Sequence, residues 1–471
     1  MSVRDLDPER GASDASSTAS GQPLAEESAA QARHDPYRAL RYRNFRLLFI
    51  GIFLSSIGEQ MVTVAIGWEL YDRTHSALAL GLVGLVQVLP VLCLSLLAGH
   101  LADRLNRRRM VMLAQTVLAL CSLGLMLLSW QRGPLWLIYG CLLLIGTATA
   151  FNEPASAALL PQTLPAALYA NAATWESSAW QLASVVGPAL GGFLVALFRG
   201  ATPVYGLNAL AIVLYLVLLA LLRLQPVNAA PSRGDDQGQE GTLRSLAEGL
   251  RFLRRTQVIL AAITLDLFAV LFGGATTLLP IYARDILKVG PTGLGWLQAA
   301  PSIGAVCVAF LLAHLPPFTR AGRTLLLAVA GFGLATIVFG LSRSFWLSLL
   351  MLFILGGLDN ISVVIRGTLV MTRTPDHMRG RVAAVNTIFI AASNKLGGFE
   401  SGLAAQLFGP VLAVVGGGLG TILVVLCVAL IWPEMRLLGA LAPEDQSHPA
   451  EQLAGQIAAE VQEETAAQRQ L

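Results

Sequence analysis

Charged residues are scarce in this sequence. Asp, Glu, Lys and Arg make up 13% of the 471 residues, whereas 55% are hydrophobic and the mean hydropathy is +0.64. A soluble domain usually carries about 25% charge because its surface must be hydrated. So long a chain with so few charges must expose most of its surface to lipid or to other helices.

Signature motifs of several enzyme classes are also missing. There is no glycine-rich loop ending in Gly-Lys-Ser/Thr, which argues against ATP hydrolysis, and no Gly-x-Ser-x-Gly elbow or paired-histidine protease motif. The five cysteines lie inside apolar runs without metal-ligand spacing, so we interpret them as packing residues. We therefore predict that the chain is not an enzyme, uses no cofactor or metal and binds no nucleic acid.

What the sequence has instead is a series of long apolar runs. A membrane-spanning helix needs about 20 mostly apolar residues. Twelve segments meet this requirement, at 46–70, 78–101, 110–130, 135–152, 169–198, 203–223, 257–281, 292–313, 324–342, 345–371, 382–408 and 411–432. The predicted fold class is an all-α membrane protein with twelve transmembrane helices in two pseudo-symmetric six-helix bundles.

Polar stretches divide the chain into parts. We predict a disordered cytoplasmic tail over 1–37, bundles over 38–224 and 257–435, a linker over 225–256 and a C-terminal tail over 436–471. Leu164-Pro165 before the fifth segment is echoed by Thr374-Pro375, 210 residues later, before the eleventh. A repeat of six helices is typical of carriers that alternate access to a central pathway.

The distribution of basic residues predicts the orientation. With the N-terminus in the cytoplasm, inside segments hold 24 of the 32 Lys and Arg residues and outside loops hold six. Both termini and the linker are therefore expected to be cytoplasmic, in a bacterial-type inner membrane. Apolar residues at helical spacing in 243–253, with arginines on much of the other face, predict a helix lying on the inner leaflet. The alternative is that this stretch simply begins the seventh spanning helix.

The loop between the second and third segments carries the strongest motif. It reads Gly99-His-Leu-Ala-Asp103-Arg104-Leu-Asn106-Arg107-Arg108-Arg109. Gly99 would let its helix approach a neighbour, and Asp103 can accept hydrogen bonds at a helix end. Asn tolerates a left-handed backbone, so we expect Asn106 to preserve a turn. A loop that is merely basic would explain the arginines but neither Gly99 nor Asp103.

A second motif lies inside segment 169–198 and reads Gly187-Pro188-Ala-Leu-Gly191-Gly192. Pro188 frees a backbone carbonyl and bends the helix, while the glycines permit close packing at the bend. We predict a hinge here. The alternative is a static kink that serves only packing.

These motifs resemble those of the major facilitator superfamily. Its loop signature is glycine-x-x-x-aspartate-arginine-x-glycine-arginine-arginine, with Asn106 replacing a glycine here, and the loop latches the two halves together in one state of the cycle. The helix motif resembles the glycine-proline-x-x-glycine-glycine signature of exporting antiporters. With Asn152-Glu153-Pro154 and Ser177-Ser178, the chain resembles the transmembrane secretion effector subgroup, which contains the enterobactin exporter and macrolide efflux proteins. Segment 135–152 has no basic residue, which argues against the arginine relay of many proton-coupled relatives.

Ionisable residues inside the membrane are expensive and suggest function. The candidates for binding protons or substrate are Glu59, Glu176, Asp266, Asp359, Arg366, Lys395 and Glu400. Asp359 and Arg366 are about 10 Å apart along one helix, so an aspartate of the seventh segment or a carboxylate of the eleventh could pair with Arg366 or Lys395 instead. Glu59 is the first choice for proton exchange, against a mere packing role. Glu69, beside Asp72 and Arg73, is expected at the outer surface as an interface residue.

The resulting prediction is a secondary active exporter of small organic molecules, such as siderophores, metabolites or drugs, driven by proton antiport through alternating access. Its expected partners are a small-molecule substrate, protons and membrane lipid, and it is expected to be a monomer. Residues Gly99, Asp103, Arg104, Arg107 and Arg108 would form the gating loop, and Gly187, Pro188, Gly191 and Gly192 the hinge. The alternatives are a transporter-like membrane scaffold or sensor without transport activity, and a membrane-embedded enzyme or lipid flippase.

Overall fold

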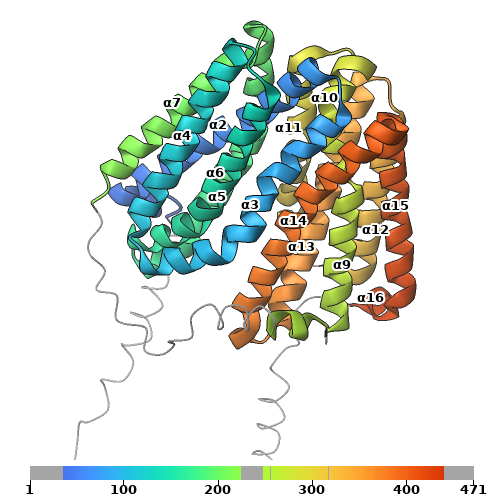
Figure 1. The fold of residues 1–471 in the computed structure, drawn as a ribbon. Coiled ribbons are helices and arrows are strands. Elements are labelled where there is room, and N and C mark those ends of the chain that lie inside the picture. Colours follow the sequence, from blue (N-terminus) through green and yellow to red (C-terminus); the bar gives the residue numbers. More distant parts are fainter. Residues whose placement is uncertain (1–34, 224–247, 255, 317, 440–471) are drawn as a thin grey trace, which may run out of the picture.

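The computed structural model describes residues 35–223, 248–254, 256–316 and 318–439, which form helices joined by short turns and contain no strand (Figure 1). Most of the two predicted tails and of the linker, including residues 243–247 of the expected inner-leaflet helix, lie outside the described residues. Residues 248–254 are helical. Residues 35–37, which the sequence assigns to the tail, contact α6 (Tyr169–Leu197) through hydrogen bonds from Asn171 and Trp175 to the Pro36 carbonyl.

The first bundle consists of six long helices. They are α2 (Arg43–Thr74), α3 (Ala77–Arg104), α4 (Arg107–Trp130), α5 (Leu135–Leu159), α6 and α7 (Thr202–Ala220). Within the bundle, α2 packs against α6 and α7, and α5 packs against α3 and α4. Side-chain caps define two of the helix starts: Ser76 accepts from the backbone N–H of Ala79, and Asn106 accepts from that of Arg109.

The second bundle repeats this arrangement. Its first span runs from α9 (Gln257–Phe272) through the 3-10 turn η4 (Gly274–Leu278) and α10 (Leu279–Ile281) to the π-helical η5 (Tyr282–Ile286). The other spans are α11 (Gly290–His314), α12 (Ala321–Leu341), α13 (Phe345–Arg373), α14 (Asp376–Phe408) and α15 (Pro410–Ile431), after which comes the short α16 (Pro433–Leu437).

Among the described residues, eleven helical segments are long and apolar enough to cross a membrane. The remaining long helix is α14, whose sequence carries several charged residues, including Lys395 and Glu400. It packs along α3, α9 and α15 as a spanning helix would, so the structure has the two six-helix bundles that the sequence predicts. All five cysteines are unpaired thiols.

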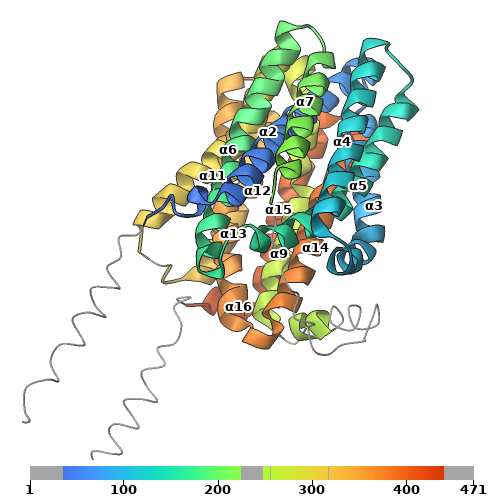
Figure 2. The ribbon, with the colours of Figure 1, turned by 90° about the vertical axis from the view of Figure 1, so that its left-hand side faces the viewer.

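The two bundles contact each other along two seams, α3 against α14 and α6 against α11. We call the end of the molecule where α7 ends and α9 begins the linker end, and the other end the opposite end. The bundles meet at the opposite end and diverge toward the linker end, which is at the bottom of Figure 1. The view turned by 90° shows the same helices crossing the molecule from end to end (Figure 2).

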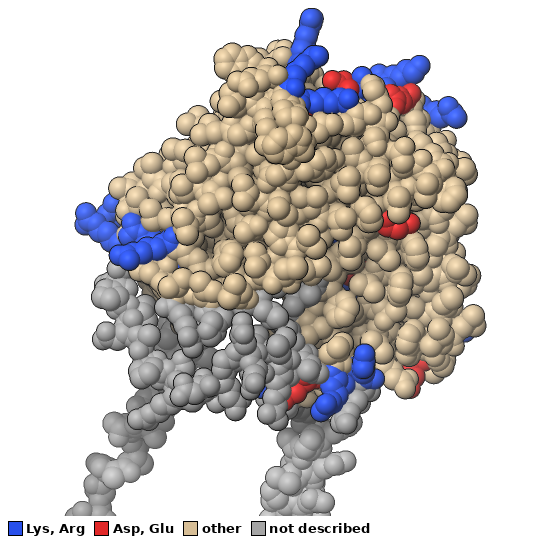
Figure 3. Space-filling view, in the orientation of Figure 1, with Lys and Arg blue, Asp and Glu red and all other residues tan. Residues whose placement is uncertain are grey.

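The outer surface is that of a protein embedded in lipid. Lys and Arg gather at the two ends of the molecule, and the broad belt between them is almost entirely uncharged on the face shown in Figure 3. Large apolar side chains such as Leu113, Leu210, Leu327 and Leu430 are exposed on the surface of the molecule. In water such a surface would be an aggregation liability, whereas in a bilayer it is the expected boundary.

Candidate functional site

The main cavity lies between the two bundles and has a volume of about 450 Å³. Helices α2, α3, α5 and α6 line one side, and η4, α10, α11 and α14 line the other. The charged residues among its lining are Glu59 on α2 and Lys395 on α14, so the two bundles contribute opposite charges to one cavity. Both had been proposed from the sequence, and the structure brings them together.

Lys395 also connects the bundles. Its Nζ donates a hydrogen bond of 2.9 Å to Gln87 Oε1 on α3. Glu59 has no ion-pair partner in the described part of the chain, and its side chain is exposed to the cavity. A carboxylate without a fixed counter-ion can exchange a proton or a ligand more easily than one held in a salt bridge.

A second cavity of about 420 Å³ adjoins the first but lies within the first bundle, and we call it the side chamber. It is lined by α2, α4, α5, α6 and α7. Three carboxylates face it, those of Glu59, Glu153 and Glu176, each from a different helix. Glu59 and Trp180 line both cavities, so the two spaces share a wall.

Glu153 was not among the membrane charges predicted from the sequence. The fourth segment was predicted to end at residue 152, and Asn152-Glu153-Pro154 was used only as part of the family resemblance. In the structure α5 continues through Pro154 to Leu159, which places Glu153 inside the bundle. Ala155 and Leu159 are fully buried against Leu48 and Val111, and this packing explains why the helix continues.

Apart from Lys395, the membrane charges predicted in the second bundle line neither cavity. Arg366 forms a buried ion pair with Asp266, one of the pairings expected from the sequence. Its Nε also donates to the Ser362 carbonyl at 3.3 Å. Asp359 faces a small void beside Asp266. Glu400 lines neither cavity and accepts a hydrogen bond of 3.4 Å from Ser401 Oγ.

Polar contacts between the bundles close the main cavity at the opposite end. Tyr71 Oη donates to the carboxylate of Asp285, and Arg284 forms an ion pair of 2.6 Å with Asp72. Ser76 Oγ donates to Gln406 Oε1 at 3.0 Å. These contacts join the bundles at the opposite end, whereas the ribbons of the two bundles diverge toward the linker end (Figure 1). These closing residues were not predicted, because they belong to loops and helix ends with no recognisable motif.

The loop at 99–109 differs from expectation in two respects. A Cβ at Gly99 would meet no atom within 4 Å, so the close helix approach predicted for this glycine is absent from this conformation. Asn106 has an extended backbone (φ −65°, ψ 109°), not a left-handed one, and serves as the N-cap of α4. The side chains of Asp103 and Arg104 lie outside the described part of the structure.

Two loop arginines hold the ends of helices in their own bundle. Arg107 Nη1 donates to the Ala158 carbonyl at 3.0 Å, and Arg108 Nη2 donates to the Ala220 carbonyl at 2.7 Å. These carbonyls belong to the last turns of α5 and α7, where a positive charge also suits the helix dipole. In this conformation both arginines therefore stabilise the first bundle.

The predicted hinge residues lie where α6 crosses its neighbours. A Cβ at Gly191 would lie 2.9 Å from the Cα of Met61 on α2, and one at Gly192 would lie 2.9 Å from the Cα of Gly295 on α11. Pro188 lines the main cavity, and Gly187 packs against α2. The motif therefore combines a packing role within the bundle with close contact between the bundles.

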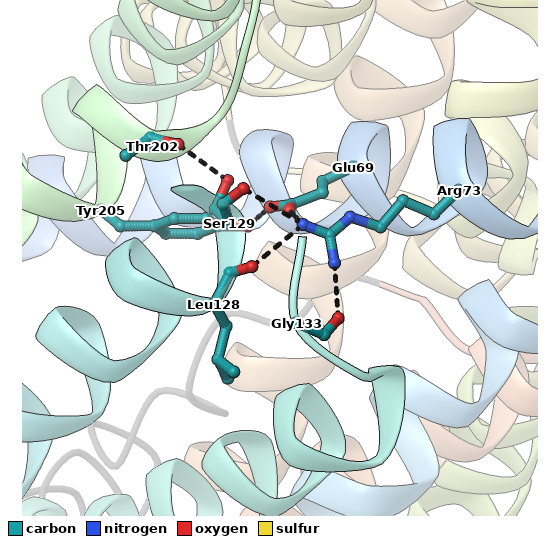
Figure 4. A network of polar contacts seen from close by, with 7 residues as sticks. All are labelled: Glu69, Arg73, Leu128, Ser129, Gly133, Thr202 and Tyr205. Atoms are coloured by element: carbon teal, nitrogen blue, oxygen red, sulfur yellow. Dashed lines mark hydrogen bonds and ion pairs between the residues drawn. The ribbon is translucent and has the colours of Figure 1, made fainter. Parts of the chain in front are cut away.

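The prediction that Glu69 is a surface interface residue is wrong. Its side chain is only 8% exposed and forms an ion pair of 2.5 Å with Arg73. Figure 4 shows this network, in which Tyr205 Oη donates to Glu69 at 2.8 Å and Arg73 donates to the carbonyls of Leu128, Ser129 and Gly133. The network joins α2 to α7 and to the end of α4.

Two six-helix bundles around a central cavity define a membrane transporter of the major facilitator type. The chain belongs to the transmembrane secretion effector family, whose model matches residues 34–464. It is 27% identical over 401 residues to the enterobactin exporter EntS of Escherichia coli O1:K1 / APEC, covering 85% of this chain and 94% of that protein. The same identity and shares hold for EntS of Shigella boydii serotype 18 (strain CDC 3083-94 / BS512).

Solved structures show the same fold. A mutant of the nucleoside transporter NupG is 14% identical with a TM-score of 0.64, over 83% of this chain and 100% of that one. A bacterial homologue of the human lysosomal transporter Spinster, in an inward-facing and unoccupied conformation, is 16% identical with a TM-score of 0.63, over 84% of this chain and 96% of that one.

Proposed function

We propose that the protein is a secondary active exporter of small organic molecules that exchanges its substrate for protons by alternating access. The observation that carries this proposal is the main cavity, which Glu59 and Lys395 face from different bundles and which polar contacts close at the opposite end. A cavity lined by both bundles, with contacts between the bundles at one end, is the arrangement that rocking of one bundle against the other requires.

The orientation belongs to the same proposal. The excess of Lys and Arg in the linker-end segments supports a cytoplasmic linker end, with both termini in the cytoplasm of a bacterial-type inner membrane. The cavity would then open to the cytoplasm in this conformation and be ready to load substrate. A green fluorescent protein fused after Leu471 should fluoresce, since it matures in the cytoplasm; a dark, full-length fusion would contradict this orientation.

Glu59 is the residue to which we assign proton exchange. In its ionised form it can bind a donor or a positive group of a ligand, and in its protonated form it cannot hold a cation. Binding of substrate and proton at one carboxylate would make the two competitive, and this competition couples their gradients.

The curated relatives are named as exporters of enterobactin, which supports export of a small organic molecule. From these relatives we infer for this chain only the direction of transport and the general size of the substrate. The flux assay therefore uses two chemically different probes, enterobactin and ethidium.

The test is a flux assay in proteoliposomes that contain the purified chain and an internal pH-sensitive dye. Enterobactin or ethidium is added as the probe, under an imposed proton gradient. We expect probe movement coupled to opposite proton movement, and we expect Glu59→Gln to abolish the proton movement. If neither probe moves protons through the native chain, or if Glu59→Gln has the same flux and pH dependence, the proposed coupling is wrong. A folded native chain without any flux would favour the scaffold or sensor.

A further inference from the structure

The second bundle contains a charge cluster that the proposed exchange at Glu59 does not use. Arg366 on α13 forms a buried ion pair with Asp266 on α9. Asp359 lies two helical turns before Arg366 on α13, and it makes no hydrogen bond or ion pair with any residue that the structure describes. If both aspartates were ionised, the cluster would therefore hold one negative charge more than its arginine can balance.

The described surroundings of Asp359 supply no further charge. The residue faces a small void that Asp266 lines from α9 and Ser362 lines from α13. The rest of the lining is apolar and consists of Ala269, Val270, Val329, Phe332 and Leu358. The neighbouring α11 and α15 contain no Asp, Glu, Lys or Arg, and α12 contains only Arg323, which is exposed at its first turn. None of the charged residues of α14 lines the void.

Ser362 provides an observation that is independent of the charges. It lies between Asp359 and Arg366 on one face of α13, is only 3% exposed and lines the void. Its carbonyl accepts from Arg366 Nε at 3.3 Å, but its hydroxyl makes no hydrogen bond in the described part of the chain. A buried hydroxyl without a partner is costly, whereas a hydroxyl beside a carboxyl group can donate to it or accept from it. The void, of about 10 Å³, also has room for one bridging water molecule.

A proton is the positive charge that fits this site. An unbalanced charge is expensive in an apolar environment, so a carboxylate without a partner takes up a proton or binds a cation. Hard metal cations prefer about six oxygen ligands, whereas two carboxylates and one hydroxyl line this void. The described His, Cys, Asp and Glu side chains form no group that could hold a metal ion. A protonated Asp359 leaves the cluster neutral and gives the Ser362 hydroxyl a hydrogen-bond partner.

We propose that Asp359 is a second proton-binding site of the exporter, at which a carboxylic acid bonded to Ser362 carries one proton in each transport cycle, in addition to the proton exchanged at Glu59. This inference rests on the proposed function, because it concerns the number of protons exchanged for each substrate molecule. The step forms and breaks only the O–H bond of the Asp359 carboxyl group, and the proton comes from water and returns to it. A second proton would add its own share of the gradient to the free energy that drives export.

The packing of α13 places this site one helix away from a seam between the bundles. A Cβ at Gly304 of α11 would lie 1.9 Å from the Phe353 carbonyl oxygen, and a Cβ at Gly356 would lie 1.9 Å from the Pro301 carbonyl oxygen. Helix α11, which α13 contacts so closely, also forms the seam with α6. A rearrangement of that seam therefore acts on α13, and a proton can bias the rearrangement if the two states bind it with different affinity.

Infrared difference spectra of the purified full-length chain test the site without any need for transport. A protonated carboxylic acid has a C=O stretching band that is separate from those of carboxylates and amides. We expect the native spectrum at neutral pH to contain one such band that Asp359→Asn removes and that Ser362→Ala shifts, because the hydroxyl no longer bonds to the acid. The band should persist in Glu59→Gln. Glu434→Gln, on the exposed surface of α16, is the matched control and should leave the band unchanged.

The proton-to-probe ratio in the flux assay tests the role of the site in transport. Asn is neutral, like the protonated acid, so Asp359→Asn should still move the probe but with one proton fewer per molecule than the native chain, whereas Glu434→Gln should keep the native ratio. The proposal is overturned by an unchanged ratio, by absence of the Asp359 band, or by a band that appears only when choline replaces Na⁺, which would mean that Na⁺ balances the charge. If the band is missing while a probe still moves protons, the second site alone is wrong. If the band behaves as expected but neither probe moves protons, the proposed function alone is wrong.

Discussion

Glu59 and Lys395 face the same cavity from two bundles, which move relative to each other in the proposed transport cycle. Their mutual distance, and with it their electrostatic interaction, therefore depends on the conformation. Charges on two moving bodies are a direct way to couple protonation to conformation, since each protonation state favours one arrangement. The same residues on a single helix would interact equally in both states and would couple nothing.

Replacing Lys395 tests this interaction. Lys395→Gln removes the positive charge that faces Glu59, and a nearby positive charge favours the ionised form of a carboxylate. We therefore expect the alkaline limb of the pH–flux profile to move to higher pH, with slower flux at neutral pH. Flux measured over a range of pH in proteoliposomes provides the comparison. Lys395→Arg keeps the charge and should keep the native profile; an unshifted profile in Lys395→Gln would show that Glu59 titrates independently of this residue.

Glu69 is expected to affect stability and not coupling. Glu69→Ala removes the buried carboxylate that pairs with the partly buried Arg73, which keeps its backbone hydrogen bonds, so we expect a cost toward the lower end of the about 3–5 kcal/mol for breaking a buried ion pair. Tyr205→Phe removes only one hydrogen bond and should cost about 1 kcal/mol. Thermal unfolding of the purified variants in detergent should rank them in this order. An Ala variant as stable as the native chain would mean that the network in Figure 4 contributes little.

At the scale of helices, the seams between the bundles depend on small residues. Gly192 on α6 meets Gly295 on α11, and Gly81 on α3 meets Gly402 on α14. In the membrane, where lipid is as apolar as the helices, close backbone packing of this kind supplies much of the association energy. Both seams lie toward the opposite end, so they are the surfaces that must separate when that end opens.

Enlarging one seam residue tests this role. In Gly192→Leu the new side chain has no space beside Gly295, so the closed opposite end is destabilised, and we expect flux to fall at least about tenfold. The matched control is Gly140→Leu on α5, where an added Cβ would meet no atom within 4 Å. Flux normalised to the amount of folded protein compares the two. Equal flux in both variants would contradict the importance of this seam.

The sequence predicted the helices well and the directions of their side chains poorly. Loop polarity and chain length locate the spans to within a few residues for most helices, because the bilayer imposes one length on all of them. The prediction failed at the end of helix α5, which continues beyond residue 152. A sequence such as Asn152-Glu153-Pro154 usually ends a helix in water, but it is tolerated inside a bundle. Because the predicted helix ended at residue 152, Glu153 was not included among the membrane charges and the acidic side chamber was not predicted.

The direction in which a side chain points could not be predicted from the sequence, for a physical reason. In a spanning helix both the lipid-facing and the core-facing sides are apolar, so hydrophobic periodicity does not tell which way Asp266 or Glu400 points. From the sequence, Asp266, Arg366 and Lys395 were therefore all candidates for binding protons or substrate. In the structure, Asp266 and Arg366 form a buried ion pair within the second bundle, whereas Lys395 lines the main cavity. The superfamily motifs predicted the fold and the exporter class, but not which carboxylates share a space.

For the whole molecule, the proposed transport cycle requires that the two ends open in turn. The structure shows one state, joined at the opposite end through Tyr71 with Asp285 and Asp72 with Arg284. Export requires a second state in which these contacts break and the linker end closes. Substrate and protons can drive the exchange only if they bind the two states with different affinity.

Paired spin-label distances can follow both ends of the molecule in the same sample. After replacement of the five native cysteines, one pair of labels would be placed at Arg132 and Arg343 at the opposite end, and another at Arg109 and Arg323 at the linker end, all on exposed residues. On acidification in lipid nanodiscs we expect the first distance to lengthen and the second to shorten, and we expect Glu59→Gln to remove this response. Distances that stay fixed, or that lengthen together at both ends, would contradict alternating access coupled to protonation of Glu59.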